Sequence, residues 1–277
     1  MPSGESFRSV LSEAVRYFAK WGYENPSVLN TWILRLRIAA EKESGPLPAK
    51  QKKLAQSLSQ LFGQMIRKGR LVERANPHVS KVTLQMIAPS LRAELDRRIL
   101  ASADLIRLNR TKAIEETLQR FSGWATSIPP GGSGAVSLRD VSSHIGKPLR
   151  SRTFEERRLA IDQGHKLIAN VNHIIALQSG AIAMRWRHVH QPGYDGRPEH
   201  IERDGEYFLL KDSWAKDKGL VRKGPNPYYD DIDQVSFLPF CRCWAEFKTS
   251  LSELPDDMLT KKGKALRDET RVTLHAV

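Results

Sequence analysis

The chain has 277 residues, 40% of them hydrophobic and 27% charged, a composition typical of soluble globular proteins that can bury a core. No apolar run approaches the ~20 residues that cross a bilayer. The first residues lack the basic and continuous apolar regions of a secretory signal. The composition excludes wholesale disorder, and we expect a protein of the cytoplasm, or of a particle assembled there, with no membrane partner.

The positive charge of the chain is unevenly distributed. The formal net charge is +13; residues 1–200 contain 31 Lys or Arg against 17 Asp or Glu, whereas residues 201–277 contain 13 against 14. Such an excess attracts nucleic acid or an acidic protein, although a solvated basic face would have the same composition. The residues expected on a nucleic-acid or partner surface are Lys52, Lys53, Arg67, Lys68, Arg70 and Arg74.

Helical periodicity dominates the first 125 residues. Apolar residues recur at three- and four-residue steps, the spacing that gives a helix one apolar face. This spacing predicts helices over 5–24, 28–43, 48–70 and 89–120, with a turn at 72–77 and with Pro89 just before the fourth helix.

A segment rich in Pro and Gly follows at 126–137 and predicts a flexible joint or an exposed loop, the best candidate for a domain boundary. Beyond it, helices are predicted at 137–145 and 153–180, the second beginning with a capping box of Thr153 and Glu156. The alternating segment 182–188 predicts a strand. The residues after 191, rich in Gly, Pro and Asp, predict short strands and long loops.

Together these elements predict an α+β fold, with a helical N-terminal half and a compact C-terminal α+β domain of short strands and long loops. The predicted domains are a basic helical domain at 1–125, the joint at 126–137, an α+β domain at 138–255 and a C-terminal tail at 256–277.

The only two cysteines, Cys241 and Cys243, are separated by one residue. In an extended segment their side chains point to the same side, so both thiolates could bind one soft metal ion, with histidines completing a tetrahedron. The candidate partners are His200, His188 and His190. A disulfide in so small a ring would be strained. Coordination of zinc, the one cofactor that this pair suggests, and two packed free thiols both remain open.

An enzymatic interpretation also exists. His200 and Glu202, followed by Pro239 and the cysteines, are similar to the His-x-Glu and Pro-Cys-x-x-Cys motifs of zinc nucleobase deaminases, in which the Glu moves protons. The Cys-x-Cys spacing and the inserted Phe240 depart from that pattern. We therefore expect no enzyme. The alternatives are a metal-dependent enzyme acting on nucleic acid or nucleotides and a plain nucleic-acid-binding protein.

The order of motifs between residues 150 and 250 resembles the phage Mu F-like minor head protein family, also called phage head morphogenesis proteins. That family has a strand with a basic residue and a tryptophan, an Arg-x-x-His motif, a turn with Asp-Gly and Phe, and a loop ending in Cys-Arg-Cys. The matching residues are Arg185, Trp186, Arg197, His200, Asp204, Gly205, Phe208, Cys241, Arg242 and Cys243. Many relatives have Asn before the first cysteine, where this chain has Phe240.

The resemblance implies a structural, non-enzymatic minor head protein of a tailed phage, located in the virion and assembled in the host cytoplasm. Its expected partners are the portal protein and the major capsid protein, with packaged DNA near the basic helical half. The matched residues are expected to form a structural lock, with or without zinc.

Several matched residues carry a physical expectation. Gly205 suits a turn with positive φ, and Asp204 is expected to bond to its own backbone there. Trp186 and Phe208 are expected in the core.

The charged residues carry further expectations. Arg197 is expected to pair with Asp204 or with an acidic cluster, and Arg242 to point away from the thiols towards an acidic loop. The acidic cluster, Asp230, Asp231 and Asp233, is itself expected to be a solvated turn, with a calcium site as the alternative.

Overall fold

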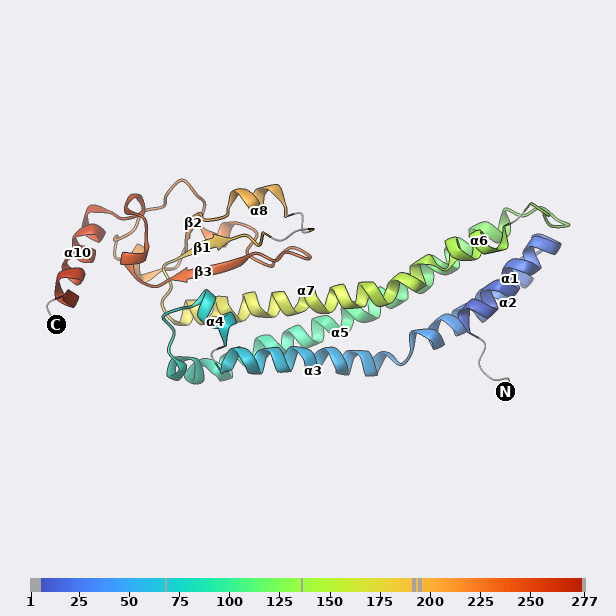
Figure 1. Cartoon of the computed structure of the whole chain (residues 1–277), viewed down its shortest axis with the longest axis horizontal. Helices are drawn as coiled ribbons and strands as arrows, with labels where there is room; N and C mark the ends of the chain where they lie inside the picture. Colours follow the sequence, from blue (N-terminus) through green and yellow to red (C-terminus); the bar gives the residue numbers. More distant parts are fainter. Residues whose placement is uncertain (1–5, 68, 136, 191–192, 194–195, 276–277) are drawn as a thin grey trace. The chain divides into compact units, whose positions relative to one another are not determined.

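The computed structural model describes residues 6–67, 69–135, 137–190, 193 and 196–275. It confirms the α+β fold class, because long helices form the N-terminal half and a small antiparallel sheet lies in the C-terminal part (Figure 1). None of the described helices is both long enough and apolar enough to cross a bilayer.

Helices account for most of the described chain. They are α1 (Phe7–Trp21), α2 (Pro26–Ser44), α3 (Leu47–Ile66), α4 (Arg70–Ala75), α5 (Lys81–Thr126), α6 (Leu138–Ile145), α7 (Lys147–Gln178), α8 (Pro198–Glu202), α9 (Trp214–Asp217) and α10 (Lys261–His275). The strands are β1 (Ala183–Arg187), β2 (Tyr207–Leu209) and β3 (Trp244–Lys248), and the 3-10 turns are η1 (Tyr229–Asp231), η2 (Leu251–Glu253) and η3 (Asp256–Met258).

The chain forms two compact units that differ from the predicted domains. The first unit contains residues 1–54 and 100–160, and the second contains residues 55–99 and 161–277. The division differs because α5 and α7 are long, and each contributes one section to each unit.

The predicted joint at 126–137 belongs to the first unit and packs against the end of α1. The N–H groups of Gly131 and Ser133 donate to the carbonyls of Trp21 and Ala19, at 2.9 and 2.8 Å. Gly132 has φ +81°, and a Cβ there would lie 2.4 Å from the Ala19 carbonyl oxygen. Among its described residues this segment is therefore a loop docked on α1.

Three local predictions were wrong. The expected turn at 72–77 overlaps α4. Helix α5 begins at Lys81, well before Pro89. Just before this start, the Ser80 hydroxyl accepts a hydrogen bond from the Thr83 N–H, as an N-terminal cap does. Helix α7 begins at Lys147, because Pro148 suits a first turn whose N–H groups need no helical partner, and Thr153 consequently lies inside the helix.

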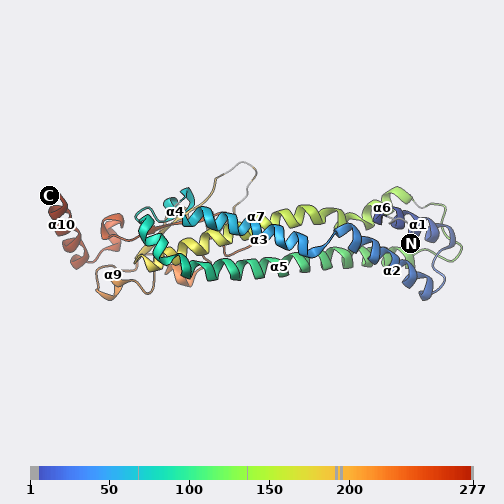
Figure 2. The same cartoon turned by 90° about the horizontal axis from the view of Figure 1, so that it is seen from below.

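The first unit is held by an apolar core between helices. Figure 2 shows α1, α2 and α6 gathered together, and buried side chains of these helices and of the later part of α5 form one cluster, which includes Phe18, Leu36, Phe121 and Ile145. Phe18 and Phe121 meet edge to face with ring centroids 5.7 Å apart, a favourable geometry for aromatic pairs.

The second unit is built around the sheet, whose strand order is β2-β1-β3 and whose neighbours are all antiparallel. The later part of α7 lies along one face of the sheet (Figure 1), where Ala176 packs in a cluster with Met184, Trp186 and Phe247. Two hydrogen bonds fix α4 to α7, from Asn76 Nδ2 to Asn172 Oδ1 at 3.1 Å and from Asn172 Nδ2 to the Leu71 carbonyl at 3.1 Å. Figure 2 shows these two helices side by side.

Candidate metal centre

The second unit brings two histidines and both cysteines together from distant parts of the sequence. His188 directly follows β1, His200 lies on α8, and Cys241 and Cys243 stand just before β3. All four are buried, with exposed fractions of 8%, 1%, 1% and 2%. Neither cysteine forms a disulfide.

The distances among His200, Cys241 and Cys243 suit a single metal ion, and His188 lies beside Cys243. His200 Nδ1 lies 3.4 Å from Cys241 Sγ and 3.7 Å from Cys243 Sγ, and His188 Nδ1 lies 3.5 Å from Cys243 Sγ. In a tetrahedral zinc site, bond lengths near 2.3 Å for sulfur and 2.0 Å for nitrogen place these ligands about 3.6 Å apart. The ligand atoms of His200, Cys241 and Cys243 all lie within 4.8 Å of one another. This buried group could therefore hold a metal ion.

Asp233 orients His200 from the side opposite the cysteines. His200 Nε2 lies 2.7 Å from Asp233 Oδ2, and Arg203 donates to Asp233 Oδ1 at 2.7 Å. Burial raises the pKa of Asp233, but the hydrogen bonds from Arg203 and His200 outweigh it, and the pKa is lowered. Asp233 is therefore ionised at neutral pH and favours the tautomer with the proton on Nε2. That tautomer leaves Nδ1 free to bind a metal, as in the carboxylate–histidine pairs of metalloproteins.

His188 is fixed by its neighbours as well. Its backbone N–H donates to Asp204 Oδ1 at 2.9 Å, and its ring contacts Gly196 so closely that a Cβ there would lie 2.2 Å from Cε1. The pKa of His188 is lowered, first by burial and then by the nearby His190 ring. A neutral imidazole, the form that binds metals, is therefore favoured.

The two thiols are electrostatically coupled. A hydrogen bond from Cys243 lowers the pKa of Cys241, whereas the same hydrogen bond, together with burial, raises the pKa of Cys243. The protein alone therefore stabilises one thiolate in this pair.

The matched residues around the cluster adopt the expected roles in part. Trp186 and Phe208 are buried, and Gly205 has φ +87°, as predicted. Asp204, expected to bond to its own turn, instead accepts from the N–H of His188 and contacts His190 Nε2 at 2.9 Å.

The prediction for Arg197 was wrong. Its guanidinium donates to the Pro239 carbonyl at 2.9 Å, and Arg203, at the other end of α8, contacts the acidic residue Asp233. The reason is that α8 places Arg197 at its start, beside the loop that leads to the cysteines. Arg242 lines a pocket beside His165 of α7.

The acidic cluster is more fully bonded than a solvated turn. Asp230 Oδ2 accepts from the Lys211 N–H at 2.8 Å, Asp231 pairs with the Lys211 ammonium, and Asp233 bonds to His200 and Arg203. The contact between His200 and Asp233 joins residues 33 positions apart. No spacing in the sequence indicated it.

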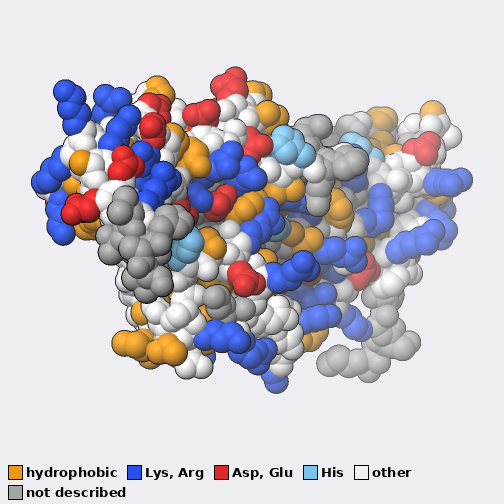
Figure 3. Space-filling view, turned by 60° about the vertical axis from the view of Figure 1, so that its left-hand side comes forward, with side chains coloured by type: hydrophobic (Ala, Val, Ile, Leu, Met, Phe, Trp, Pro, Cys, Tyr) orange, Lys and Arg blue, Asp and Glu red, His pale blue; other side chains and the backbone are white. Residues whose placement is uncertain are grey.

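The residues predicted for a nucleic-acid or partner surface are exposed where the structure describes them, namely Lys52, Lys53, Arg67, Arg70 and Arg74; Lys68 lies outside the described residues. On the face shown in Figure 3, Lys and Arg side chains are widely spread, with acidic side chains between them in several places. Arg74 has a further role, because its guanidinium stacks 3.6 Å from the centroid of the Trp244 ring.

Comparison of the chain with protein-family models, with curated proteins and with solved structures finds no match.

Proposed function

We propose that this chain is a structural minor head protein of a tailed phage, whose C-terminal α+β part is a Mu F-like domain closed by a zinc ion. The observation that carries the proposal is the convergence of the matched motif residues. They are spread over positions 185–243 of the sequence, yet most of them contact one another or the cluster of His188, His200, Cys241 and Cys243.

The contacts within this set are specific. Arg185 Nε donates to the Gly205 carbonyl at 3.0 Å, and the Gly205 N–H donates to the Trp186 carbonyl at 2.9 Å. The Trp186 ring packs against His200 with centroids 5.1 Å apart. An arrangement in which motif residues support one another is what a structural lock requires.

Phe240, the position where this chain departs from the motif, also supports the resemblance. Its φ is +61°, in the left-handed region that Asn adopts several times more readily than most residues. Many members of the phage Mu F-like family have Asn before the first cysteine. The backbone of this chain therefore has the conformation for which Asn is suited, although the side chain is Phe.

A structural role for zinc follows from the donor set. Two cysteines and two histidines give a closed tetrahedral site, whereas catalytic zinc sites keep one position open. The four side chains are buried. Glu202, which a deaminase-like reaction would need, is exposed and has no hydrogen bond or ion pair among the described residues. When bound, the ion would cross-link the end of β1, α8 and the segment before β3.

Metal content tests the zinc part of the proposal. We expect about one zinc per chain by inductively coupled plasma mass spectrometry after purification without added metal. The double variant Cys241→Ser/Cys243→Ser should lose the ion, and His200→Gln should reduce it strongly. His173→Gln, which changes a half-buried histidine outside the cluster, is the matched control and should keep it. A metal-free wild-type protein with an intact fold would contradict the zinc site.

Co-purification tests the head-assembly part. The tagged chain is co-expressed with the portal protein and the major capsid protein encoded in the same phage genome. We expect one of them to be retained after nuclease treatment and at 0.5 M salt. Phosphate contacts weaken steeply with salt, so retention that nuclease or salt abolishes would instead favour the plain nucleic-acid-binding alternative. Retention of neither protein would contradict the head-assembly role and leave the zinc result unaffected.

A further inference from the structure

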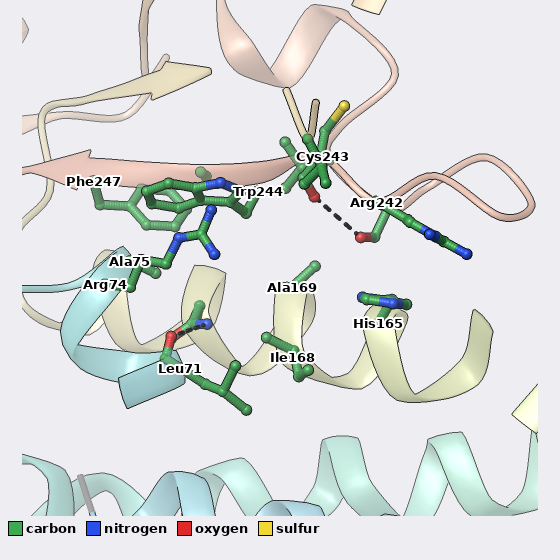
Figure 4. Close-up of a pocket in the computed structure, with 15 residues that line it drawn as sticks. Leu71, Arg74, Ala75, His165, Ile168, Ala169, Arg242, Cys243, Trp244 and Phe247 are labelled. Carbon is green, nitrogen blue, oxygen red and sulfur yellow. Dashed lines mark hydrogen bonds between the residues drawn. The ribbon is translucent and has the colours of Figure 1, made fainter. Parts of the chain in front are cut away.

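A pocket of about 340 Å³ lies in the second unit between α4, α7 and β3. Figure 4 shows β3 on one side of it and α7 on the other, with α4 at one end. Its volume is at the lower end of the range for ligand pockets in proteins. Cys243 lines this pocket and also belongs to the candidate metal centre.

The middle of the pocket is apolar. Leu71 comes from α4, Ile168 and Ala169 from α7, and Phe247 from β3. A large apolar side chain placed there would be removed from water, which is favourable.

The side-chain amide of Asn172 and the hydroxyl of Ser236, which line the pocket, are engaged within the protein. Asn172 Nδ2 donates to the Leu71 carbonyl, and Asn172 Oδ1 accepts from Asn76. The Ser236 hydroxyl donates to the Cys243 carbonyl at 3.4 Å. A polar ring such as a nucleobase would find few partners, and burying unsatisfied polar groups is unfavourable.

The charged side chains of the pocket are all basic. Arg74 lies at one end, beneath Trp244, and Arg242 lies at the other end beside His165 (Figure 4). No Asp or Glu is among the described residues that line the pocket.

Arg74 lies in an electrostatically unfavourable position. Its guanidinium stacks on Trp244, and Arg187 approaches the same ring at 5.9 Å. Burial, and then the charge of Arg187, lower the pKa of Arg74. A carboxylate at this end of the pocket would offset both effects.

We propose that this pocket binds a peptide segment of a partner protein in which a large apolar side chain is flanked on both sides by acidic residues. The apolar side chain would occupy the space between Ile168 and Phe247, and the flanking carboxylates would contact Arg74 at one end and Arg242 at the other. A mononucleotide fits less well, because its charge lies at one end only and its base needs hydrogen-bond partners. The inference stands on the pocket and does not depend on the head-protein proposal.

The test uses the full-length protein and a fluorescein-labelled nonapeptide with Phe at its centre and two Glu residues on each side. We expect saturable binding by fluorescence anisotropy at low salt. A peptide with Ala at the centre, and one with Lys in place of Glu, should each bind at least tenfold more weakly. Arg74→Gln should weaken binding of the Phe peptide about tenfold, the effect expected from loss of one charge-assisted contact.

Two variants separate a pocket from general basic attraction. Arg70→Gln removes an exposed charge from α4 outside the pocket and should leave the affinity within twofold. Ala169→Leu fills the apolar middle while keeping both arginines, and it should abolish binding. Circular dichroism and metal content check that each variant is folded.

Three results would overturn the proposal. These are no binding of the Phe peptide up to 1 mM, equal loss of affinity in Arg70→Gln and Arg74→Gln, or binding of AMP that is tighter than binding of the peptide. Each would show that the pocket does not recognise an acidic peptide with an apolar centre.

Discussion

The two units of this protein bury polar groups in different ways. In the first unit, Glu156 bonds to Arg110 Nε at 2.8 Å and lies 3.8 Å from Arg152 Nε, within helices whose apolar faces already form a core. In the second unit, the buried His and Cys side chains connect three-residue and five-residue strands and loops. The second unit also buries apolar clusters on the sheet and an ion pair between Glu94 and Arg98, but only in this unit do buried His and Cys side chains gather among the described residues.

This difference indicates which interactions stabilise each unit. Long helices bury a continuous apolar face, and a buried ion pair adds little net stability to such a core. A small sheet with long loops loses more conformational entropy for each apolar contact that it gains. An ion held by the buried His and Cys side chains would offset that loss.

Removal of metal should produce the largest difference between the two units. Structural zinc sites in small peptides contribute about 10–16 kcal/mol at neutral pH, more than any single side chain. Treatment with a zinc chelator should therefore increase amide hydrogen exchange in β1, α8 and β3, while α1 and α2 keep their protection. Hydrogen–deuterium exchange with mass spectrometry measures both units in one experiment. Equal deprotection of α1 and β3, or no change in β3, would refute the assigned role of the ion.

Glu156→Ala should produce the next largest effect, this time in the first unit. The substitution leaves Arg110 and Arg152 buried with no carboxylate between them, and loss of one partner of a buried pair costs about 3–5 kcal/mol. The matched control is Glu115→Ala, because Glu115 pairs with Arg37 but is 43% exposed. An exposed pair is worth about 0–1 kcal/mol. Urea unfolding of both variants measures the difference, and equal midpoints would show that the first unit tolerates an unpaired buried charge.

The helices of the first unit could be predicted from the sequence because their cause is local. Apolar residues at three- and four-residue steps gave the extents of α1 and α2 to within a few residues. The starts of α5 and α7 were missed, because Pro89 and Thr153 were interpreted as boundaries although tertiary packing continues the helices through them. A proline or a capping residue is therefore a poor predictor of a helix boundary where tertiary packing stabilises the helix on both sides of that residue.

The candidate metal centre could be predicted only in outline. The Cys-x-Cys pair and the histidines were identified because thiol and imidazole are the ligands that zinc prefers, and the structure brings His188, His200, Cys241 and Cys243 together. The bond from Asp233 to His200 and the contact from Arg197 to Pro239 could not be predicted. Both depend on how a segment of more than thirty residues, which includes β2 and α9, returns to α8, and no local pattern encodes that path.

The conformation of Phe240 gives the smallest effect and the sharpest test of how the second unit is held. A non-glycine residue in the left-handed region costs roughly 1–2 kcal/mol, and Asn tolerates that region better than Phe. Because Phe240 is 42% exposed, Phe240→Asn should lose little burial and should stabilise the second unit by about 0.5–1 kcal/mol. Phe237→Asn is the matched control, since Phe237 is 70% exposed and has no positive φ, and it should give no gain. Urea unfolding of both variants in the metal-loaded state measures the effect. A stability gain in Phe237→Asn equal to that in Phe240→Asn would trace the effect to lost surface hydrophobicity, and only a gain confined to Phe240→Asn identifies backbone strain beside the cysteines.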